Sequence, residues 1–377
     1  MMDRRQFSMM TGAAILAGCN SAGQNVPQSH PPVTRSDSRR FLPQKNAGLD
    51  AWVNRAFARA RANGISDRTL RRAKPHIGFL PEVVNIDRNQ TEFKRSFEDY
   101  LAIATSENRV ATGRAMLRRH AGLLSKIEAT YGVEKEVVIA VWGLESRYGA
   151  RKGDVPTLSA LATLAHDGRR ARLFERQFQA ALRILENGDI TPARMMGSWA
   201  GAMGHTQFMP TSYLSFAVDF DHDGRRDIWR ETPTDALASA AAYLARNGWR
   251  KGARWGQESA SGAIAPAGSS GPRFNKGANY RVLGSYNNAQ KYIIGVGILS
   301  DLIAGRPGLR HEFGPDVNGM RLKDRIALQK GLARAGYDVG EPDGVIGPKT
   351  LAAISAYEQA QGLTVSGQPS LALLSRL

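Results

Sequence analysis

Glu145 has the sequence setting in this chain that most strongly suggests chemistry. It follows the apolar run 137–144, and at helical spacing it shares one face with three apolar residues: Val138, Val141 and Trp142. Burial disfavours the ionised form of a carboxyl and raises its pKa, so such a group can stay protonated near neutral pH and act as a general acid. The same setting also suits a structural glutamate that pairs with Arg147 or with a more distant arginine.

An acidic loop is the second feature with chemical potential. Residues 219–227 hold four carboxylates in an otherwise basic chain. The loop offers side-chain oxygens at its first, third and fifth positions, glycine at the sixth and a backbone carbonyl at the seventh: Asp219, Asp221, Asp223, Gly224 and Arg225. The twelfth position is Arg230, not the bidentate glutamate of an EF-hand. We expect a structural calcium ion, favoured over magnesium because the ligands are many and flexible; a metal-free acidic turn is the alternative.

Other chemistry has little support in the sequence. Seven histidines show neither an HExxH motif nor paired metal-ligand spacing, and we expect each to be a surface residue or a hydrogen-bonded polar residue: His30, His76, His120, His166, His205, His222 and His311. No Gly-x-Ser-x-Gly, Walker or dinucleotide-binding pattern occurs in the sequence.

The N-terminus has the pattern of an exported lipoprotein. Arg4 and Arg5 precede an apolar stretch, 9–16, that is too short to span a bilayer. The following Leu-Ala-Gly-Cys sequence ends at Cys19, the only cysteine, and resembles a lipobox. We therefore expect a signal peptide over 1–18, lipidation of Cys19, and a periplasmic protein anchored at the outer membrane. A lone buried cysteine in a cytosolic protein is the alternative.

Composition limits the class of protein and its partners. The chain has 377 residues, 42% of them hydrophobic, which is enough for one large domain and a small one. Its formal net charge of +17 indicates an acidic partner, such as nucleic acid, an anionic membrane or an acidic cell-wall polymer. The sequence has no RNP, zinc-finger or basic-zipper pattern, so a nucleic-acid partner is not expected.

The elements that position these residues are mainly helical by pattern. A Ser-, Pro- and Gln-rich stretch predicts a flexible tether over 19–45, followed by a body over 46–310. Apolar periodicity predicts eight helices in this body: 51–63, 88–105, 113–131, 136–145, 157–165, 169–186, 234–247 and 289–303. The Ser/Ala/Gly/Pro segment 259–272 is predicted to be an inserted surface loop.

The C-terminal segment reads as a separate domain over 319–377. Three short helices are expected, each with one apolar stripe: Ile326, Leu328 and Leu332; Leu351, Ile354 and Tyr357; and Leu371, Leu374 and Leu377. The loop 343–350 between the first two helices contains two glycines and a proline, which indicate a fixed turn.

Three ordered motifs carry a resemblance to a known family. Glu-Ser-Arg-Tyr-Gly at 145–149, the stretch 197–210 and Tyr-Asn-Asn at 286–288 are similar to motifs of the membrane-bound lytic murein transglycosylase B family. The segment 343–350 resembles a small peptidoglycan-binding module. The resemblance implies a mainly α, lysozyme-like catalytic domain with a small three-helix C-terminal domain, acting on peptidoglycan glycan strands.

The resemblance also implies a reaction that needs one carboxyl. Glu145 would protonate the β-1,4 bond between N-acetylmuramic acid and N-acetylglucosamine, then accept the muramyl C6 hydroxyl proton as a 1,6-anhydro ring closes. A well-oriented internal hydroxyl competes strongly with water, because effective molarities reach about 10⁵ to 10⁸ M. A hydrolytic muramidase using the same glutamate, and a non-catalytic peptidoglycan-binding scaffold, are the alternatives.

Two site residues implied by the resemblance lie in the stretch 197–210. Ser198 and Gln207 match residues that line the family's site, where a hydroxyl and an amide can bind sugar acetamido or ring oxygens. Between them, the small residues of 201–204 suit either a tight contact within the protein or a close approach of sugar to the backbone.

The remaining implied residues come from distant parts of the chain. Tyr286 and Asn287 match residues opposite the catalytic glutamate, and Tyr100 falls where the family has a tyrosine in its cleft, although it could equally be a core residue. Asp235 matches a later carboxylate of the family's metal loop.

Overall fold

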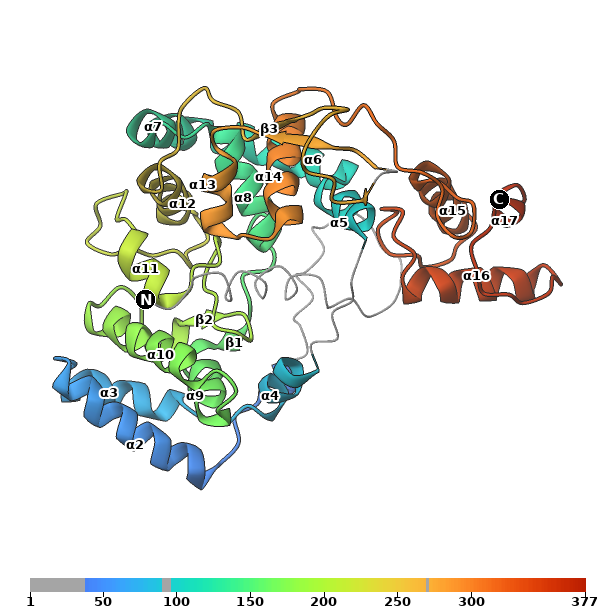
Figure 1. Ribbon diagram of the computed structural model, residues 1–377. Coiled ribbons are helices and arrows are strands. Elements are labelled where there is room, and N and C mark those ends of the chain that lie inside the picture. The colour runs from blue at the N-terminus through green and yellow to red at the C-terminus, as the bar shows by residue number, and fades with distance from the viewer. Residues whose placement is uncertain (1–37, 90–95, 269–270) are drawn as a thin grey trace. The chain divides into compact units, whose positions relative to one another are not determined.

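The computed structural model describes residues 38–89, 96–268 and 271–377 (Figure 1). The expected signal peptide 1–18, Cys19 and most of the expected tether lie outside the described residues. Within them the secondary structure is almost entirely helical, and the strands form two sheets of two strands each. This confirms the mainly α prediction.

The chain divides into two compact units. The first comprises Met1–Glu92, Met116–Lys251 and Ser285–Asn288, and the second comprises Phe93–Ala115, Gly252–Gly284 and Ala289–Leu377. Each unit is thus assembled from segments that are distant in sequence, and the segment with Tyr286 and Asn287 belongs to the first.

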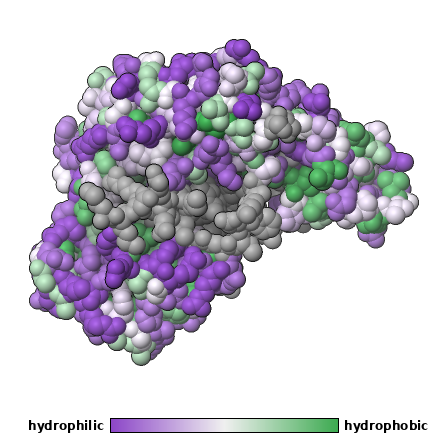
Figure 2. Space-filling view, viewed as in Figure 1, coloured by the Kyte–Doolittle hydropathy of each residue, from purple (hydrophilic) through white to green (hydrophobic). Residues whose placement is uncertain are grey.

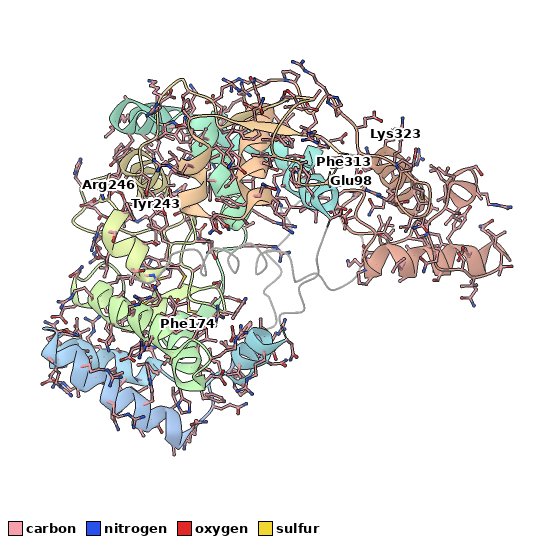
Figure 3. All side chains as sticks on the ribbon, in the orientation of Figure 1. Glu98, Phe174, Tyr243, Arg246, Phe313 and Lys323 are labelled. Atoms are coloured by element: carbon pink, nitrogen blue, oxygen red, sulfur yellow. The ribbon has the colours of Figure 1, made fainter. Side chains whose placement is uncertain are left out.

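The first unit contains most of the predicted helices. Its helices are α2 (Ala47–Ala62), α3 (Asp67–Ala73), α4 (Pro81–Arg88), α7 (Ala121–Tyr131), α8 (Lys135–Ser146), α9 (Thr157–Asp167), α10 (Ala171–Glu186), α11 (Pro210–Phe216) and α12 (Thr234–Arg246). Here α10 packs along α9 and α11, while α12 contacts α7 and α8 (Figure 1). Phe174 (labelled in Figure 3) and Phe178, one helical turn apart on α10, are both almost fully buried, as its apolar period predicts.

Two predicted helices are each interrupted in the structure. The predicted helix 88–105 is wrong, because α4 ends at Arg88 and α5 (Phe97–Ala104) begins only after Ser96, whose hydroxyl accepts a hydrogen bond from the Asp99 N–H at 3.0 Å. The predicted helix 113–131 is also two helices, since α6 (Glu107–Arg119) and α7 are separated by His120. Caps and breaks of this kind leave the apolar periodicity undisturbed. A prediction from periodicity alone therefore gives one continuous helix where the structure has two.

The second unit contains α5 and α14 (Gln290–Ile303), while α6 and α13 (Tyr280–Tyr286) are each divided between the two units. The predicted loop 259–272 connects two antiparallel strands, β3 (Gly256–Glu258) and β4 (Phe274–Lys276). Trp255 lies so close to α14 that a Cβ on Gly297 would be 2.2 Å from the indole ring. The inserted segment is therefore anchored at both ends by paired strands.

The C-terminal domain has the three predicted helices: α15 (Leu322–Arg334), α16 (Pro348–Ala360) and α17 (Leu371–Leu374). Its core comprises Met320, Leu328, Leu332, Val339, Ala353, Ile354, Tyr357 and Leu373. The expected third stripe is partly wrong, because Leu371 is 50% exposed and Leu373 is buried in its place. This helix is a single turn, too short for periodicity to identify its inner face.

Arg325 on α15 is a buried charge of the second unit. It forms ion pairs with Asp316 at 3.0 Å and with Glu98 on α5 at 2.9 Å, and it donates from Nε to the Gly344 carbonyl at 2.9 Å. Glu98 is labelled in Figure 3. Removing one partner of such a buried pair leaves an uncompensated charge, which is strongly destabilising.

The surface carries many polar side chains. Figure 2 shows hydrophilic residues predominating over α2 and α3, with smaller apolar areas between them. Among helices of the described ranges, none combines the length and apolar character that crossing a bilayer would require.

Candidate active site

Glu145 is buried at the end of α8. All residues of this helix from 138 to 146 are buried, and Glu145 itself is only 3% exposed. The structure thus places the carboxyl in the apolar setting that its sequence predicts. Burial of this kind favours the protonated form of a carboxyl, which is what a general acid requires.

Helix α8 ends at Ser146, one residue after Glu145, and a left-handed turn follows. Arg147 and Tyr148 have left-handed backbone angles, with φ of 50° and 57°, and Gly149 has a φ of 87°. Two successive non-glycine residues in this region store strain that the surrounding packing must offset. The Tyr148 ring packs over α8 so closely that a Cβ on Gly143 would lie 2.6 Å from it. The left-handed turn at 147–149 therefore ends α8 close to Glu145, and the Tyr148 ring packs against the last turn of the helix.

The stretch 197–210 forms a set of tight turns. Strands β1 (Val155–Pro156) and β2 (Met196–Gly197) pair, and Met203 and Phe208 exchange backbone hydrogen bonds at 2.8 and 3.1 Å. A Cβ on Gly201 would lie 2.4 Å from Leu161, and one on Gly204 would lie 2.4 Å from a backbone oxygen. The space beside these glycines is filled by protein atoms, which supports the tight-contact alternative over a close approach of sugar.

The two implied binding residues of this stretch both make local hydrogen bonds. Gln207 has a φ of 51°, and its amide nitrogen donates to the carbonyls of Lys152 at 2.9 Å and Gly204 at 2.8 Å. The Ser198 hydroxyl accepts from the Ala202 N–H at 3.0 Å. Since both amide hydrogens of Gln207 are bound to backbone, its oxygen is the atom that remains for a hydrogen bond to sugar.

Tyr286 joins the same turns to the surroundings of Glu145. Its hydroxyl donates to the Thr206 carbonyl at 2.7 Å, and its ring packs against Phe208 and against Tyr243 (labelled in Figure 3), with ring centroids 5.8 and 4.8 Å away. Burial and the nearby negative charge of Glu145 raise the pKa of Tyr286 well above its usual range. The structure therefore brings Tyr286, the 203–208 turn and Glu145 together, with the phenol held neutral.

The other two implied residues have different positions. Asn287 is 2% exposed in the first unit. Tyr100 lies half-buried on α5 of the second unit, where the Lys291 ammonium is 5.9 Å from its ring centroid. Of the implied substrate contacts, Ser198, Gln207, Tyr286 and Asn287 thus share the first unit with Glu145.

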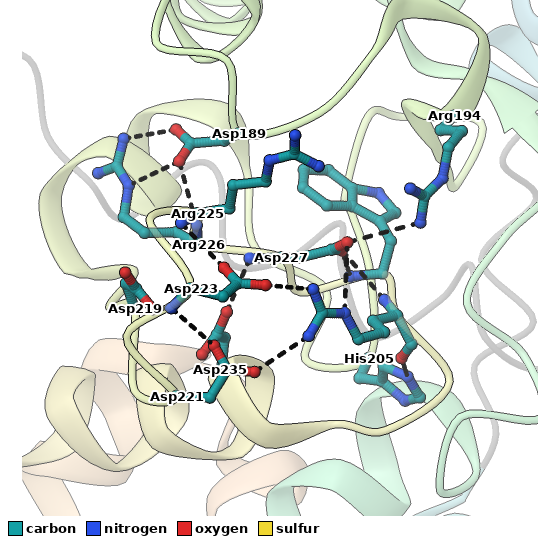
Figure 4. Close-up of polar contacts among 12 residues, drawn as sticks. Asp189, Arg194, His205, Asp219, Asp221, Asp223, Arg225, Arg226, Asp227 and Asp235 are labelled. Atoms are coloured by element: carbon teal, nitrogen blue, oxygen red, sulfur yellow. Dashed lines mark hydrogen bonds and ion pairs between the residues drawn. The ribbon is translucent and has the colours of Figure 1, made fainter.

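The acidic loop brings three of its five predicted ligands together (Figure 4). Carboxylate oxygens of Asp219, Asp221 and Asp223 lie within 4.8 Å of one another. The Asp219 carboxylate accepts from the N–H groups of Asp223 at 3.1 Å and Gly224 at 2.9 Å. Arg230 donates to Asp221 at 3.0 Å and also to Asp223. The twelfth-position arginine therefore neutralises the same oxygens that a cation would use.

Asp235 is buried, as is Asp227. Its two oxygens accept from the N–H groups of Phe220 at 2.8 Å and Asp227 at 2.9 Å. Burial raises the pKa of Asp235 to about 6, and the charges of Asp221 and Asp219 act in the same direction. Four carboxylates and the Arg225 carbonyl are hard oxygen donors, so the residues present fit calcium, with Arg230 as its competitor.

Several contacts that shape the site have no sequence signal. The Thr206 carbonyl, which accepts from Tyr286, is a backbone group that any residue would supply. Trp142 was expected as one of the apolar residues beside Glu145, but its indole N–H donates to His205, a residue that the sequence marks only as surface or hydrogen-bonded. Gly149 of the 145–149 motif lies against the same histidine, which could have been inferred only from a requirement for glycine at that position.

Comparisons with known proteins agree with this architecture. The family described as the transglycosylase SLT domain matches residues 48–262, and a putative peptidoglycan binding domain matches residues 321–377. The membrane-bound lytic murein transglycosylase B of Escherichia coli strain K12 is 37% identical over 273 residues, which cover 67% of this chain and 74% of that protein.

Two solved structures extend the comparison. SltB3 from Pseudomonas aeruginosa in complex with NAG-NAM-pentapeptide is 38% identical with a TM-score of 0.68, covering 88% of this chain and 100% of that one. Soluble lytic transglycosylase SltB1 from the same organism is 26% identical with a TM-score of 0.59, covering 68% and 98%. Both similarities extend over nearly the whole of the solved chains.

Proposed function

This chain belongs to the transglycosylase SLT domain family, and from that premise we propose how it cleaves peptidoglycan. It is a peptidoglycan lytic transglycosylase with a lysozyme-like catalytic fold and a C-terminal peptidoglycan-binding domain. The observation that carries the mechanism is the burial of Glu145 at the end of α8. Tyr286 lies near enough to Glu145 for the charge of that carboxylate to raise the pKa of its phenol.

Glu145 acts first as an acid and then as a base. In its protonated form it donates a proton to the oxygen that joins N-acetylmuramic acid to N-acetylglucosamine, and the bond between that oxygen and C1 breaks. The carboxylate then accepts the proton of the muramyl C6 hydroxyl as its oxygen bonds to C1. Glu145 thus gives up one proton and takes one back, so it ends in its starting form. The product is a 1,6-anhydro end, and no water is consumed.

The buried surroundings suit both halves of this cycle. Apolar residues of α8 favour the neutral acid before cleavage. Tyr286, whose phenol stays protonated, adds no second negative charge beside the carboxylate that forms. Exclusion of water then favours the internal hydroxyl as nucleophile, because it is already oriented.

The test is Glu145→Gln, which keeps the size of the side chain and removes its acidity. We expect clearance of purified sacculi to fall by about 10² to 10⁴ fold, the usual range for general acid catalysis. Mass spectrometry of wild-type digests is expected to show 1,6-anhydro ends. Reducing ends would instead identify water as the nucleophile, and unchanged clearance by the glutamine variant would exclude Glu145.

We further propose that the loop 219–235 holds a structural calcium ion. Asp219, Asp221, Asp223 and Asp235 would supply carboxylate oxygens and Arg225 its backbone carbonyl. When bound, the ion would supply positive charge that offsets the repulsion of these carboxylates. The convergence of carboxylate oxygens from Asp219, Asp221 and Asp223, which lie within 4.8 Å of one another, supports this proposal.

The site of action is the periplasmic cell wall. The similarity of this chain to a membrane-bound lytic murein transglycosylase supports this location. We propose that Cys19 is lipidated after removal of 1–18 and anchors the protein at the outer membrane, with 19–45 as the tether. The lipobox-like sequence ending at Cys19 supports this proposal. Radiolabelled palmitate incorporation that is lost in Cys19→Ala would test it.

A further inference from the structure

His205 is buried between the helix that carries Glu145 and the end of the acidic loop. It is 3% exposed. The indole N–H of Trp142 on α8 donates to its Nδ1 at 3.1 Å, and its Nε2 lies 2.7 Å from the Arg230 carbonyl oxygen. Figure 4 shows this second contact beside the loop.

These partners leave one tautomer. An indole nitrogen can only donate, so Nδ1 must be the acceptor and carry no proton. A carbonyl oxygen can only accept, so Nε2 must carry the proton. Both ring nitrogens are then satisfied by groups from different segments, and the neutral Nε2–H form is the one that fits.

The backbone of the same residue holds the other side of Glu145. The hydroxyl of Ser146 donates to the His205 carbonyl at 2.5 Å and accepts from the Gly149 N–H at 3.0 Å. The His205 N–H donates to the Ile228 carbonyl at 3.0 Å. His205 is therefore bound to residues on both sides of Glu145 and to the 228–230 segment.

The 145–149 motif is shaped around this ring. A Cβ on Gly149 would lie 2.6 Å from both Cε1 and Nδ1 of His205. The φ of 87° at Gly149 adds a second reason why only glycine fits there. The turn after Glu145 and the imidazole thus occupy adjoining space with no room between them.

We propose that His205 is a positioning residue, whose imidazole in the Nε2–H form links Trp142 on α8 to the Arg230 carbonyl and so sets the position of the Glu145 carboxyl. It touches no substrate atom in this role. The inference rests on Glu145 as the acid and base of the proposed function. Small displacements of such a group are costly, since a misplacement of about 1 Å can lower a rate by about 10² fold.

The first experiment uses the unmodified protein. Imidazole ¹⁵N spectra should show His205 as the Nε2–H tautomer, assigned by the signal lost in His205→Gln. The Trp142 indole N–H, assigned by Trp142→Phe, should appear downfield as a hydrogen-bonded donor. An Nδ1–H tautomer would overturn the proposal whatever the activity of any variant, and whatever the outcome for Glu145→Gln.

The second experiment separates the two hydrogen bonds. His205→Asn places an oxygen near the Nδ1 position and can keep the Trp142 bond, whereas His205→Gln places a nitrogen near Nε2 and can keep only the Arg230 bond. We expect kcat to fall by about 10 to 10² fold in the glutamine variant with little change in KM, and to fall less in the asparagine variant. His166→Gln, on α9 with its ring against Phe79, is the matched control and should retain wild-type kcat.

The contrary outcomes are defined for each variant. Wild-type kcat in His205→Gln together with a shifted Trp142 indole signal would show that the link does not position Glu145. A loss of activity that matches the loss of folded protein, measured by circular dichroism, would reduce His205 to a structural role. Activity remaining in Glu145→Gln would contradict the proposed function, while the tautomer result would still stand.

Discussion

At the scale of the residue, Glu145 and His205 are the two titratable groups that matter most here. Each is only 3% exposed, and burial in general favours the neutral form of a titratable group. For the carboxyl, the neutral form is the proton donor. For the imidazole, it is the form whose two nitrogens match an indole donor and a carbonyl acceptor. The same buried environment therefore suits both the proposed proton donor, Glu145, and the proposed neutral tautomer of His205.

The pKa of His205 predicts how stability depends on pH. Burial lowers this pKa to about 4, with Lys152 adding to the effect and Glu231 and Asp227 opposing it. In the unfolded chain this histidine has a pKa of about 6.5, so it takes up a proton as the pH falls below that value, whereas in the folded protein it stays neutral until about pH 4. Between these two pH values, lowering the pH therefore favours the unfolded state. The stability supplied by neutral His205 is thus fully present above about 6.5 and falls by on the order of 2 kcal/mol by pH 5.

Melting temperatures of wild type and His205→Gln, taken at pH 7 and pH 5, check this prediction. The advantage of the wild type is expected to shrink at pH 5, because glutamine does not titrate. Comparing the two proteins at each pH cancels the contributions of the other carboxylates. An advantage that is constant or larger at pH 5 would show that His205 is protonated in the folded protein.

At the scale of the element, the acidic loop is held at several points around its ligands. Arg226 forms an ion pair with Asp189 at 2.6 Å, and the Trp229 indole donates to the Met196 carbonyl at 2.8 Å. The Arg230 guanidinium forms an ion pair with Asp221 at 3.0 Å. The loop is therefore largely formed by protein contacts, so an ion would add stability to a framework that already exists.

Calcium is expected to raise the melting temperature of the wild type, since an ion that binds only the folded state stabilises it by mass action. At 100 times its dissociation constant the gain is about 2.7 kcal/mol. Asp219→Ala with Asp223→Ala should abolish the calcium response. Differential scanning calorimetry with and without chelator provides the measurement.

Arg230→Ala is the informative companion variant. Removing the guanidinium that competes for Asp221 and Asp223 should strengthen the calcium response, although its backbone carbonyl still binds His205. A calcium response that survives the double alanine change would reject these ligands. Intrinsic activity with saturating calcium should differ little between wild type and Arg230→Ala.

At the scale of the whole molecule, the chain combines a catalytic domain with a small domain that has its own core. The C-terminal domain should raise the local concentration of enzyme on insoluble wall, as linked binding modules do. It should not alter the chemical step on a short soluble strand. The two kinds of substrate therefore separate its role from that of Glu145.

Deleting residues 319–377 should reduce co-sedimentation with sacculi and slow their clearance, while kcat on short soluble glycan strands stays close to wild type. Because Arg325 pairs with Glu98 on α5, the deletion is best combined with Glu98→Gln, so that this carboxylate is not left without its partner. Full-length Glu98→Gln is the control. Clearance of sacculi at the wild-type rate by the shortened protein would contradict a targeting role.

Much of the architecture was predictable because it rests on local pattern. The apolar stripe of α10, the Gly-Pro start of α16 and the burial of Glu145 all follow from residues within a few turns of one another. The breaks at Ser96 and His120 were missed, since a cap can interrupt a helix without disturbing its period. The clustering of Asp219, Asp221 and Asp223 was also local, being set by alternate positions and one glycine.

By itself, the sequence determined which helix carries the proposed acid, which loop gathers the carboxylates and where the second domain begins. Only the tertiary structure decided which residues of the first unit meet around Glu145. The bonds from Trp142 and Ser146 to His205 span 63 and 59 residues, and that from Tyr286 to Thr206 spans 80. Contacts of this kind depend on the packing of distant segments and on hydrogen-bond direction, and neither leaves a period or a composition that a sequence displays.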